Sequence, residues 1–240
     1  MMRCAAAGRP PPVWLFDLDD TLHDASGATM AELRVAMGEY IERELGIDTE
    51  ASNALRRRYW LRYGATLLGL VHHHGVKAAH FLHHTHLLPG LEDRIRGHRH
   101  DLAALARLPG RKYILTNAPA AYARRVLGVL GISGWFDGLI SIEDMHMFGH
   151  LRPKPDARML RQVAARLGVH PRRCVLVEDS CDNLKGARRA GMHTVWMRRW
   201  LPAGPSRLRA RRCPAYVDRR VPSLLALQRL AGGLSSELWR

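Results

Sequence analysis

Residues 14–24 read WLFDLDDTLHD, and this stretch decides how the rest of the chain is interpreted. It joins a short apolar run, which begins at Val13, to four acids: Asp17, Asp19, Asp20 and Asp24. Carboxylates so close together repel one another unless a positive charge offsets them. The chain carries a formal net charge of +15, so placing four acids here calls for a specific reason.

Length and composition are those of a globular protein. The 240 residues can bury a large core and suit one domain with an insert or two modest domains. The excess of 37 Lys and Arg over 22 Asp and Glu gives a basic surface that could attract nucleic acid, an anionic membrane or phosphorylated small molecules. Arg is concentrated only in 198–220, where we expect a solvated surface rather than a binding site.

The sequence has no sign of secretion or of a membrane span. The start, MMRCAAAGRPPP, lacks the apolar stretch of a signal peptide, and no run of about 18 apolar residues occurs. The four cysteines form no CxxC pair. We therefore expect a cytoplasmic protein with no membrane partner.

Short apolar runs alternate with helical patterns along most of the chain. Five runs are predicted as strands buried on both faces: 13–16, 113–115, 139–142, 175–177 and 194–197. Between the third and fourth runs, Met159, Leu160 and Val163 follow the spacing of one helix face, with Asp156 as the expected N-cap and Gly168 as the expected stop. This alternation predicts an α/β domain with a mainly parallel sheet.

The stretch 25–90 breaks the alternation, because it has apolar residues at helical spacing and no convincing strand. We expect a small all-helical domain there, and Pro89 and Gly90 mark the return to the α/β domain. The predicted organisation is a discontinuous core over 11–24 and 91–225, a helical cap over 25–90 and a C-terminal tail over 226–240.

Polar residues follow several predicted strands, where ligands bind in a parallel sheet. They are Asp17 and Asp19, Thr116 and Asn117, Lys154, and Glu178 and Asp179. A calcium loop of the EF-hand kind is excluded because Leu22 stands where the invariant Gly should be and Ala28 where the bidentate Glu should be. Turn capping explains one or two acids, and we assign Asp20 and Asp24 to that role.

These residues resemble the haloacid dehalogenase (HAD) superfamily of phosphotransferases. Its four motifs appear in order as Asp17-x-Asp19-x-Thr21, Thr116, Lys154 and Glu178-Asp179. The resemblance implies a Rossmann-like core, with the insert as the cap between the first two motifs. Three segments also resemble the pyrimidine 5′-nucleotidase branch: RYGATLLGL, LLPGLE and VEDSCDNLKGAR.

The chemistry of a phosphate monoester accounts for the acids, because Mg²⁺ must screen the anionic ester from an anionic nucleophile. The resemblance implies Asp17 as nucleophile, Asp19 as general acid and base, and Lys154 as partner of both the nucleophile and the phosphoryl group. Thr116 and Asn117 would bind phosphate. The expected Mg²⁺ ligands are Asp17, Asp179 and Glu178 through a water. The resemblance implies the backbone carbonyl of Asp19 as a further ligand.

The cap is expected to choose the substrate, with Tyr63 and His86 as its candidate residues. Seven of the 14 histidines lie in the cap. His80 and His84, four residues apart, could bind zinc, but no nearby acid or cysteine completes the set, so solvated or substrate-facing histidines are the preferred interpretation.

The sequence thus predicts a Mg²⁺-dependent phosphomonoester hydrolase acting on a small metabolite, with a pyrimidine nucleoside monophosphate as the leading substrate. The alternative within the superfamily is a sugar-phosphate or phosphoglycolate phosphatase. The alternative of another class is a basic nucleic-acid-binding protein on a phosphatase scaffold.

Overall fold

All five predicted strands form, and with a sixth they make a parallel sheet in the order β3-β2-β1-β6-β7-β8. The computed structural model describes residues 11–200 and 213–233. The strands of this sheet are β1 (Val13–Phe16), β2 (Lys112–Leu115), β3 (Gly138–Ile140), β6 (Cys174–Glu178), β7 (His193–Met197) and β8 (Arg219–Val221). Every pairing between them is parallel, which confirms the predicted α/β class.

The sheet is buried on both faces because its residues alternate between two apolar cores. Trp14 and Phe16 belong to one core, and Val13 and Leu15 belong to the other. The first is covered by α8 (Ala120–Leu130) and α12 (Leu224–Gly233), and the second by α9 (Ala157–Arg166) and α10 (Cys181–Ala190). Short helices α6 (Leu91–Arg94) and α7 (Arg99–Leu102) lead from the insert into β2.

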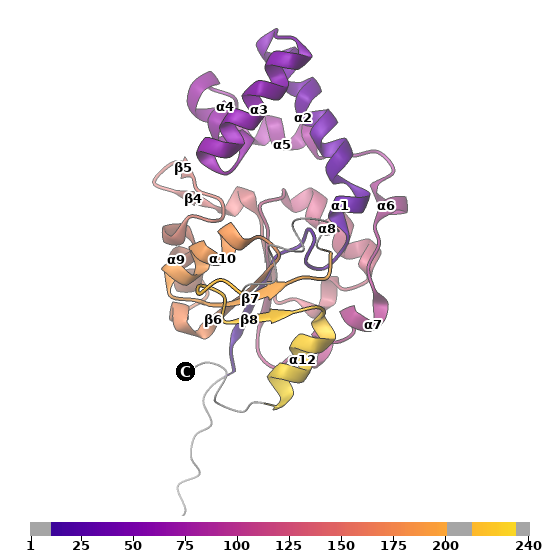
Figure 1. Cartoon of the computed structure of the whole chain (residues 1–240), viewed down its shortest axis with the longest axis vertical. Coiled ribbons are helices and arrows are strands. Elements are labelled where there is room, and N and C mark those ends of the chain that lie inside the picture. The colour runs from indigo at the N-terminus through magenta and orange to yellow at the C-terminus, as the bar shows by residue number, and fades with distance from the viewer. Residues whose placement is uncertain (1–10, 201–212, 234–240) are drawn as a thin grey trace, which may run out of the picture.

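The insert is helical throughout and stands above the carboxyl end of the sheet (Figure 1). It consists of α1 (Ala25–Ala28), α2 (Met30–Leu45), α3 (Thr49–Tyr63), α4 (Thr66–His74) and α5 (Ala78–Thr85). Gly46, Gly64 and Gly75 end α2, α3 and α4 in the left-handed conformation. The bundle has its own apolar core, which Ile142 of the α/β part joins.

Three features differ from the sequence prediction or extend it. β8 and the two-stranded hairpin of β4 (His146–Met147) and β5 (His150–Leu151) were not predicted. Ile142, expected to end a strand, instead starts a 3₁₀ turn. α12 runs across the proposed boundary between 225 and 226 and packs on the sheet, while residues 234–240 of the proposed tail lie outside the described residues.

No helix within 11–200 or 213–233 is both long enough and apolar enough to cross a membrane. Most of the Arg-rich segment 198–220 lies outside the described ranges, so its expected solvated surface stays a prediction.

Candidate active site

The carboxyl ends of the three central strands carry the site. Asp17 follows β1, Thr116 follows β2, and Glu178 is the last residue of β6. Because β1 pairs with both other strands, these residues lie side by side at one end of the sheet. The Asp17 N–H donates to the Val177 carbonyl at 3.0 Å, so strand pairing continues through the first acid.

Lys154 connects the first and fourth motifs. Its Nζ lies 2.6 Å from Oδ1 of Asp17 and 2.7 Å from Oε2 of Glu178, and only 3% of the residue is exposed. Charge-assisted bonds of this length in a buried place fix both carboxylates. The structure therefore brings together residues that lie 137 and 24 positions apart in the chain.

Asn117 holds the loop that carries Lys154. Its Nδ2 donates to the Lys154 carbonyl at 3.0 Å, and the Lys154 N–H donates to its Oδ1 at 2.9 Å. Both polar atoms of this side chain are thus engaged with the lysine backbone, whereas the sequence prediction placed Asn117 on phosphate. The neighbouring Thr116 is buried, accepts from the Ala118 N–H at 3.0 Å and lines the cavity described below.

Three acids are arranged as a cation site. Asp17, Glu178 and Asp179 can each offer one carboxylate oxygen, and these oxygens lie within 4.8 Å of one another. Burial, and then the charge of Glu178, raises the pKa of Asp17 and of Asp179. Burial opposes the charge on Lys154, but the carboxylates of Asp17 and Glu178 prevail and raise its pKa. Among the described residues, the site holds three carboxyl groups and only one lysine, so acidic groups are in excess. Carboxylate oxygens are hard donors and fit Mg²⁺.

The Asp19 carboxylate has partners of its own. Its Oδ1 accepts from His23 Nε2 at 2.9 Å and from the Tyr122 hydroxyl at 2.8 Å. Burial raises the pKa of Asp19, but the His23 bond and charge and the Tyr122 bond outweigh burial and hold it below the usual value. Two donors thus orient this acid, which lines the cavity described below.

The other two acids of the opening stretch accept hydrogen bonds from backbone N–H groups, as expected for turn capping. Asp20 accepts from the Ser26 N–H at 2.8 Å. Asp24 is the N-cap of α1 and accepts from the Gly27 N–H at 2.9 Å. Neither bond involves the Asp17 or Lys154 side chain.

Gly186 of α10 allows the Lys154 loop to lie against that helix. A Cβ added at Gly186 would come within 2.2 Å of the Pro155 carbonyl oxygen. Gly186→Ala should therefore displace the loop and lower the free energy of unfolding by about 1–3 kcal/mol, the usual cost of overpacking. Urea unfolding monitored by circular dichroism measures this change.

Gly128→Ala is the matched control, because Gly128 lies in α8 with no atom within 4 Å of the added Cβ. That change should stabilise the protein by about 0.5–1 kcal/mol through helix propensity. Equal stability of the two variants would contradict the proposed contact between α10 and the Lys154 loop.

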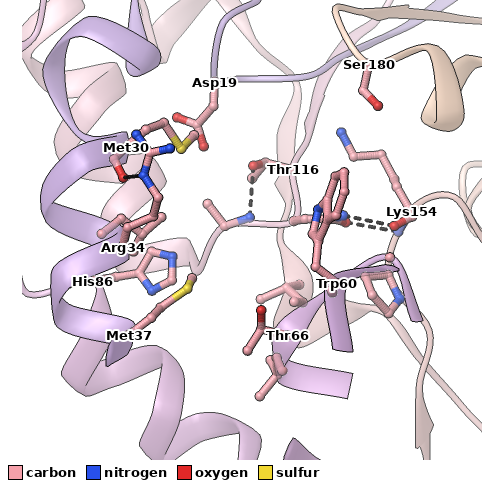
Figure 2. A pocket seen from close by; sticks show the side chains of 18 of the residues that line it. Asp19, Met30, Arg34, Met37, Trp60, Thr66, His86, Thr116, Lys154 and Ser180 are labelled. Atoms are coloured by element: carbon pink, nitrogen blue, oxygen red, sulfur yellow. Dashed lines mark hydrogen bonds between the residues drawn. The ribbon is translucent and has the colours of Figure 1, made fainter. Parts of the chain in front are cut away.

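A cavity of about 1040 Å³ extends from the strand ends to the insert. Its core side includes Asp17, Asp19, Thr116, Lys154 and Asp179. Its other wall is built by side chains of α2, α3, α4 and α5, together with His86 just after α5. In Figure 2, Arg34 and His86 lie on one side of the cavity and Trp60 on the other.

Of the two cap residues proposed from the sequence, only one lines the cavity. His86 lines the cavity. Tyr63 is not among the lining residues, because it shares a face of α3 with Tyr59 and its hydroxyl bonds to His73 Nε2 at 2.5 Å. Trp60, three residues earlier, is 61% exposed and lines the cavity instead.

Comparison with known proteins gives one family match and several relatives. A model of the haloacid dehalogenase-like hydrolases matches residues 13–191. Fructose-1-phosphate phosphatase YqaB of Escherichia coli is 35% identical over 83 residues, 35% of this chain and 42% of that one. A plasmid-encoded phosphoglycolate phosphatase of Cupriavidus necator is 35% identical over 132 residues, 54% of each chain. The chain thus spans about half the length of these two relatives.

A longer match is to the glyceraldehyde 3-phosphate phosphatase of Methanopyrus kandleri, 28% identical and covering 77% of this chain and 83% of that one. Among solved structures, a HAD phosphatase of Thermococcus onnurineus superposes with a TM-score of 0.59 at 22% identity, covering 92% of this chain and 98% of that one. L-2-haloacid dehalogenase of Xanthobacter autotrophicus gives 0.59 at 22% identity, covering 93% and 99%. At this identity the structural likeness concerns the fold alone.

Proposed function

Because the chain belongs to the haloacid dehalogenase-like hydrolases, we propose that it hydrolyses a phosphate monoester of a small metabolite through an aspartyl-phosphate on Asp17. The observation that carries this proposal is the buried Lys154 ammonium between Asp17 and Glu178, with Asp179 beside them. A carboxylate can approach an anionic phosphate only where positive charge offsets the repulsion. Lys154 supplies one such charge.

The residues divide the chemistry into two halves. First, an oxygen of Asp17 bonds to phosphorus while the bond from phosphorus to the ester oxygen breaks, and Asp19 gives a proton to the departing alcohol. Because His23 and Tyr122 lower the pKa of Asp19, it must take up this proton before the ester bond breaks. Then Asp19 takes a proton from a water as that water attacks phosphorus, and the bond to Asp17 breaks. Inorganic phosphate leaves and both acids return to their starting states.

The supporting groups hold charge and geometry in place. Lys154 orients Asp17, and Thr116 with neighbouring backbone N–H groups would bind the phosphoryl oxygens. Asp17, Asp179 and the backbone carbonyl of Asp19 would hold Mg²⁺, and Glu178 would act through water, since its oxygens already accept from Lys154 at 2.7 Å and from the Ser180 N–H at 3.2 Å. Bound there, Mg²⁺ would offset the charge of the carboxylates and the phosphoryl oxygens.

Two candidate substrate classes are supported by different observations. The pyrimidine nucleoside 5′-monophosphate proposed from the sequence gains support from the cavity volume of about 1040 Å³ and from Trp60, whose exposed indole could stack on a base. The names of the relatives favour the alternative, because fructose 1-phosphate, phosphoglycolate and glyceraldehyde 3-phosphate carry no base. Rates with nucleotides, sugar phosphates and phosphoglycolate, each with and without Mg²⁺, separate the two classes. A protein that hydrolysed none of these esters would instead support the nucleic-acid-binding alternative.

The proposed cation site also predicts a change in stability. Saturating Mg²⁺ should raise the melting temperature by about 5–10 °C, because binding to the folded state alone adds free energy of unfolding. Asp179→Asn should lose most of this shift, since one anionic ligand is removed. Differential scanning fluorimetry with and without chelator measures both.

Asp182→Asn is the control for this prediction, because Asp182 is an exposed acid at the start of α10 that does not line the cavity. It should keep the full shift and the full activity. Unchanged turnover in the presence of chelator, or an equal shift in the Asp179→Asn protein, would refute the site.

A further inference from the structure

The cap side of the cavity is positively charged. Arg34 of α2 and Arg56 and Arg57 of α3 line it, and no residue of α2–α5 that lines the cavity is an acid. Within the described ranges, the three arginines take part in none of the salt bridges, although Arg43 of the cap does. The described lining opposite the catalytic acids thus carries three arginines and no acid.

Among these three arginines, Arg56 has a buried donor without a partner in the described part of the chain. Its Nη1 donates to Asn53 Oδ1 at 3.2 Å, whereas its Nε is buried without a hydrogen-bond partner among the described residues. Its Nη1 also reaches α2, since it lies 3.7 Å from a Cβ built at Gly38, one turn after Arg34. Burial, and then the charge of Arg34, lowers the pKa of Arg56. A buried charged donor without an acceptor is costly, and an anion between two guanidinium groups would remove that cost.

Arg34 offers donors of its own to such an anion. Its Nε donates to the Met30 carbonyl one turn earlier at 3.1 Å, which anchors the side chain along α2. The planar fork of a guanidinium binds the two oxygens of a carboxylate or phosphate together. Arg34 and Arg56 therefore both offer guanidinium donors on this wall of the cavity.

We propose that the leaving group of the substrate carries an anionic group of its own, a carboxylate or a second phosphate, and that Arg34 and Arg56 bind this group. The inference rests on the proposed function, because it assumes that the transferred phosphoryl group lies at Asp17 on the opposite side of the cavity. The acids and Lys154 then serve the reacting phosphate, and the arginines select esters by their second charge. Arg57 adds to the positive potential of the same wall.

Pairs of esters that differ only in the second charge test this inference. The carboxylate arm compares phosphoglycolate with 2-hydroxyethyl phosphate, and the phosphate arm compares fructose 1,6-bisphosphate with fructose 1-phosphate. In at least one of these two comparisons, kcat/KM of the wild-type protein should favour the doubly anionic ester by about tenfold or more. Arg34→Gln and Arg56→Gln should each reduce that ratio by about tenfold.

Arg62→Gln is the matched control, because Arg62 lies on α3 outside the cavity with its guanidinium 5.5 Å from the Tyr63 ring centroid. It should leave the ratio unchanged. A wild-type ratio near one in both arms would overturn the inference, and so would equal losses on both members of a pair, since the arginines would then act on the transferred phosphate.

Equilibrium binding separates this inference from the proposed function. Asp17→Asn protein with Mg²⁺ should bind the preferred doubly anionic ester about tenfold more tightly than its partner by calorimetry, and adding Arg56→Gln should remove the difference. Turnover without charge preference would keep the function and reject the inference. Preferential binding without any turnover by the wild-type protein would reject the function and keep the anion site.

Discussion

Asp17→Asn should reduce ester hydrolysis by a factor on the order of 10⁵ or more, because removing the nucleophile of a covalent enzyme costs about 10⁶ in kcat. The amide cannot form the acyl-phosphate, so no phosphoenzyme should appear either. The fold should persist, since Asn has the shape of Asp and Glu178 still pairs with Lys154 at 2.7 Å. Steady-state rates and intact-mass measurement after mixing with substrate check both expectations.

Asp24→Asn is the control within the same stretch. Asp24 caps α1, and Asn is an equally good capping residue, so this variant should keep both its stability and its activity. A phosphoryl group on the Asp17→Asn protein, or turnover by it at the wild-type rate, would show that the nucleophile lies elsewhere.

Much of the fold could be predicted because strands that are buried on both faces appear in the sequence as short apolar runs. The run Val13–Phe16 is apolar at every position, as a strand covered on both faces requires, and the structure confirms it. β8 carries no such signal, because Arg219 and Arg220 are exposed on an edge strand that pairs only with β7. Charged residues on an edge discourage pairing with other chains, and they also hide the strand from a search for apolar runs.

The contacts around the site could be predicted only where they are local. His23 lies four residues after Asp19 within the quoted stretch, so its bond to that acid has a signal in the sequence. Tyr122 reaches the same oxygen from 103 residues away, and Asn117 reaches the Lys154 backbone from 37 residues away. Such pairs depend on which strands become neighbours and where each loop turns.

Recognition of the cap wall depends on helix phase. Tyr63 and Trp60 are three residues apart on α3 and so are neighbours on its surface, yet only Trp60 lines the cavity. Gly69 of α4 packs closely on α3, because a Cβ there would come within 2.1 Å of the Tyr59 ring. Asn53, Arg56 and Trp60, which line the cavity, recur every three or four residues, and Tyr63 continues the same spacing, so the pattern alone could not separate it from them.

Asp19→Asn should separate proton transfer from nucleophilic attack. The Asn oxygen can still accept from His23 and Tyr122, which hold Asp19 at 2.9 and 2.8 Å, so the side chain should keep its orientation. What it loses is the proton that the leaving oxygen takes and the base that activates water, each worth a factor of about 10² to 10⁴. Esters with alkyl leaving groups should therefore be hydrolysed far more slowly than by the wild-type protein.

The leaving group decides how the two halves of the reaction respond. An aryl ester such as p-nitrophenyl phosphate needs little protonation, so Asp19→Asn protein should still transfer its phosphoryl group to Asp17. The water-dependent second step should then lag, and one added phosphoryl group should accumulate in the intact mass. An alkyl ester on the same protein is the internal control and should give no such accumulation. Loss of the proton donor must slow hydrolysis most for the ester whose leaving group needs a proton. If Asp19→Asn slowed hydrolysis of alkyl and aryl esters by the same factor, Asp19 would therefore not be the proton donor.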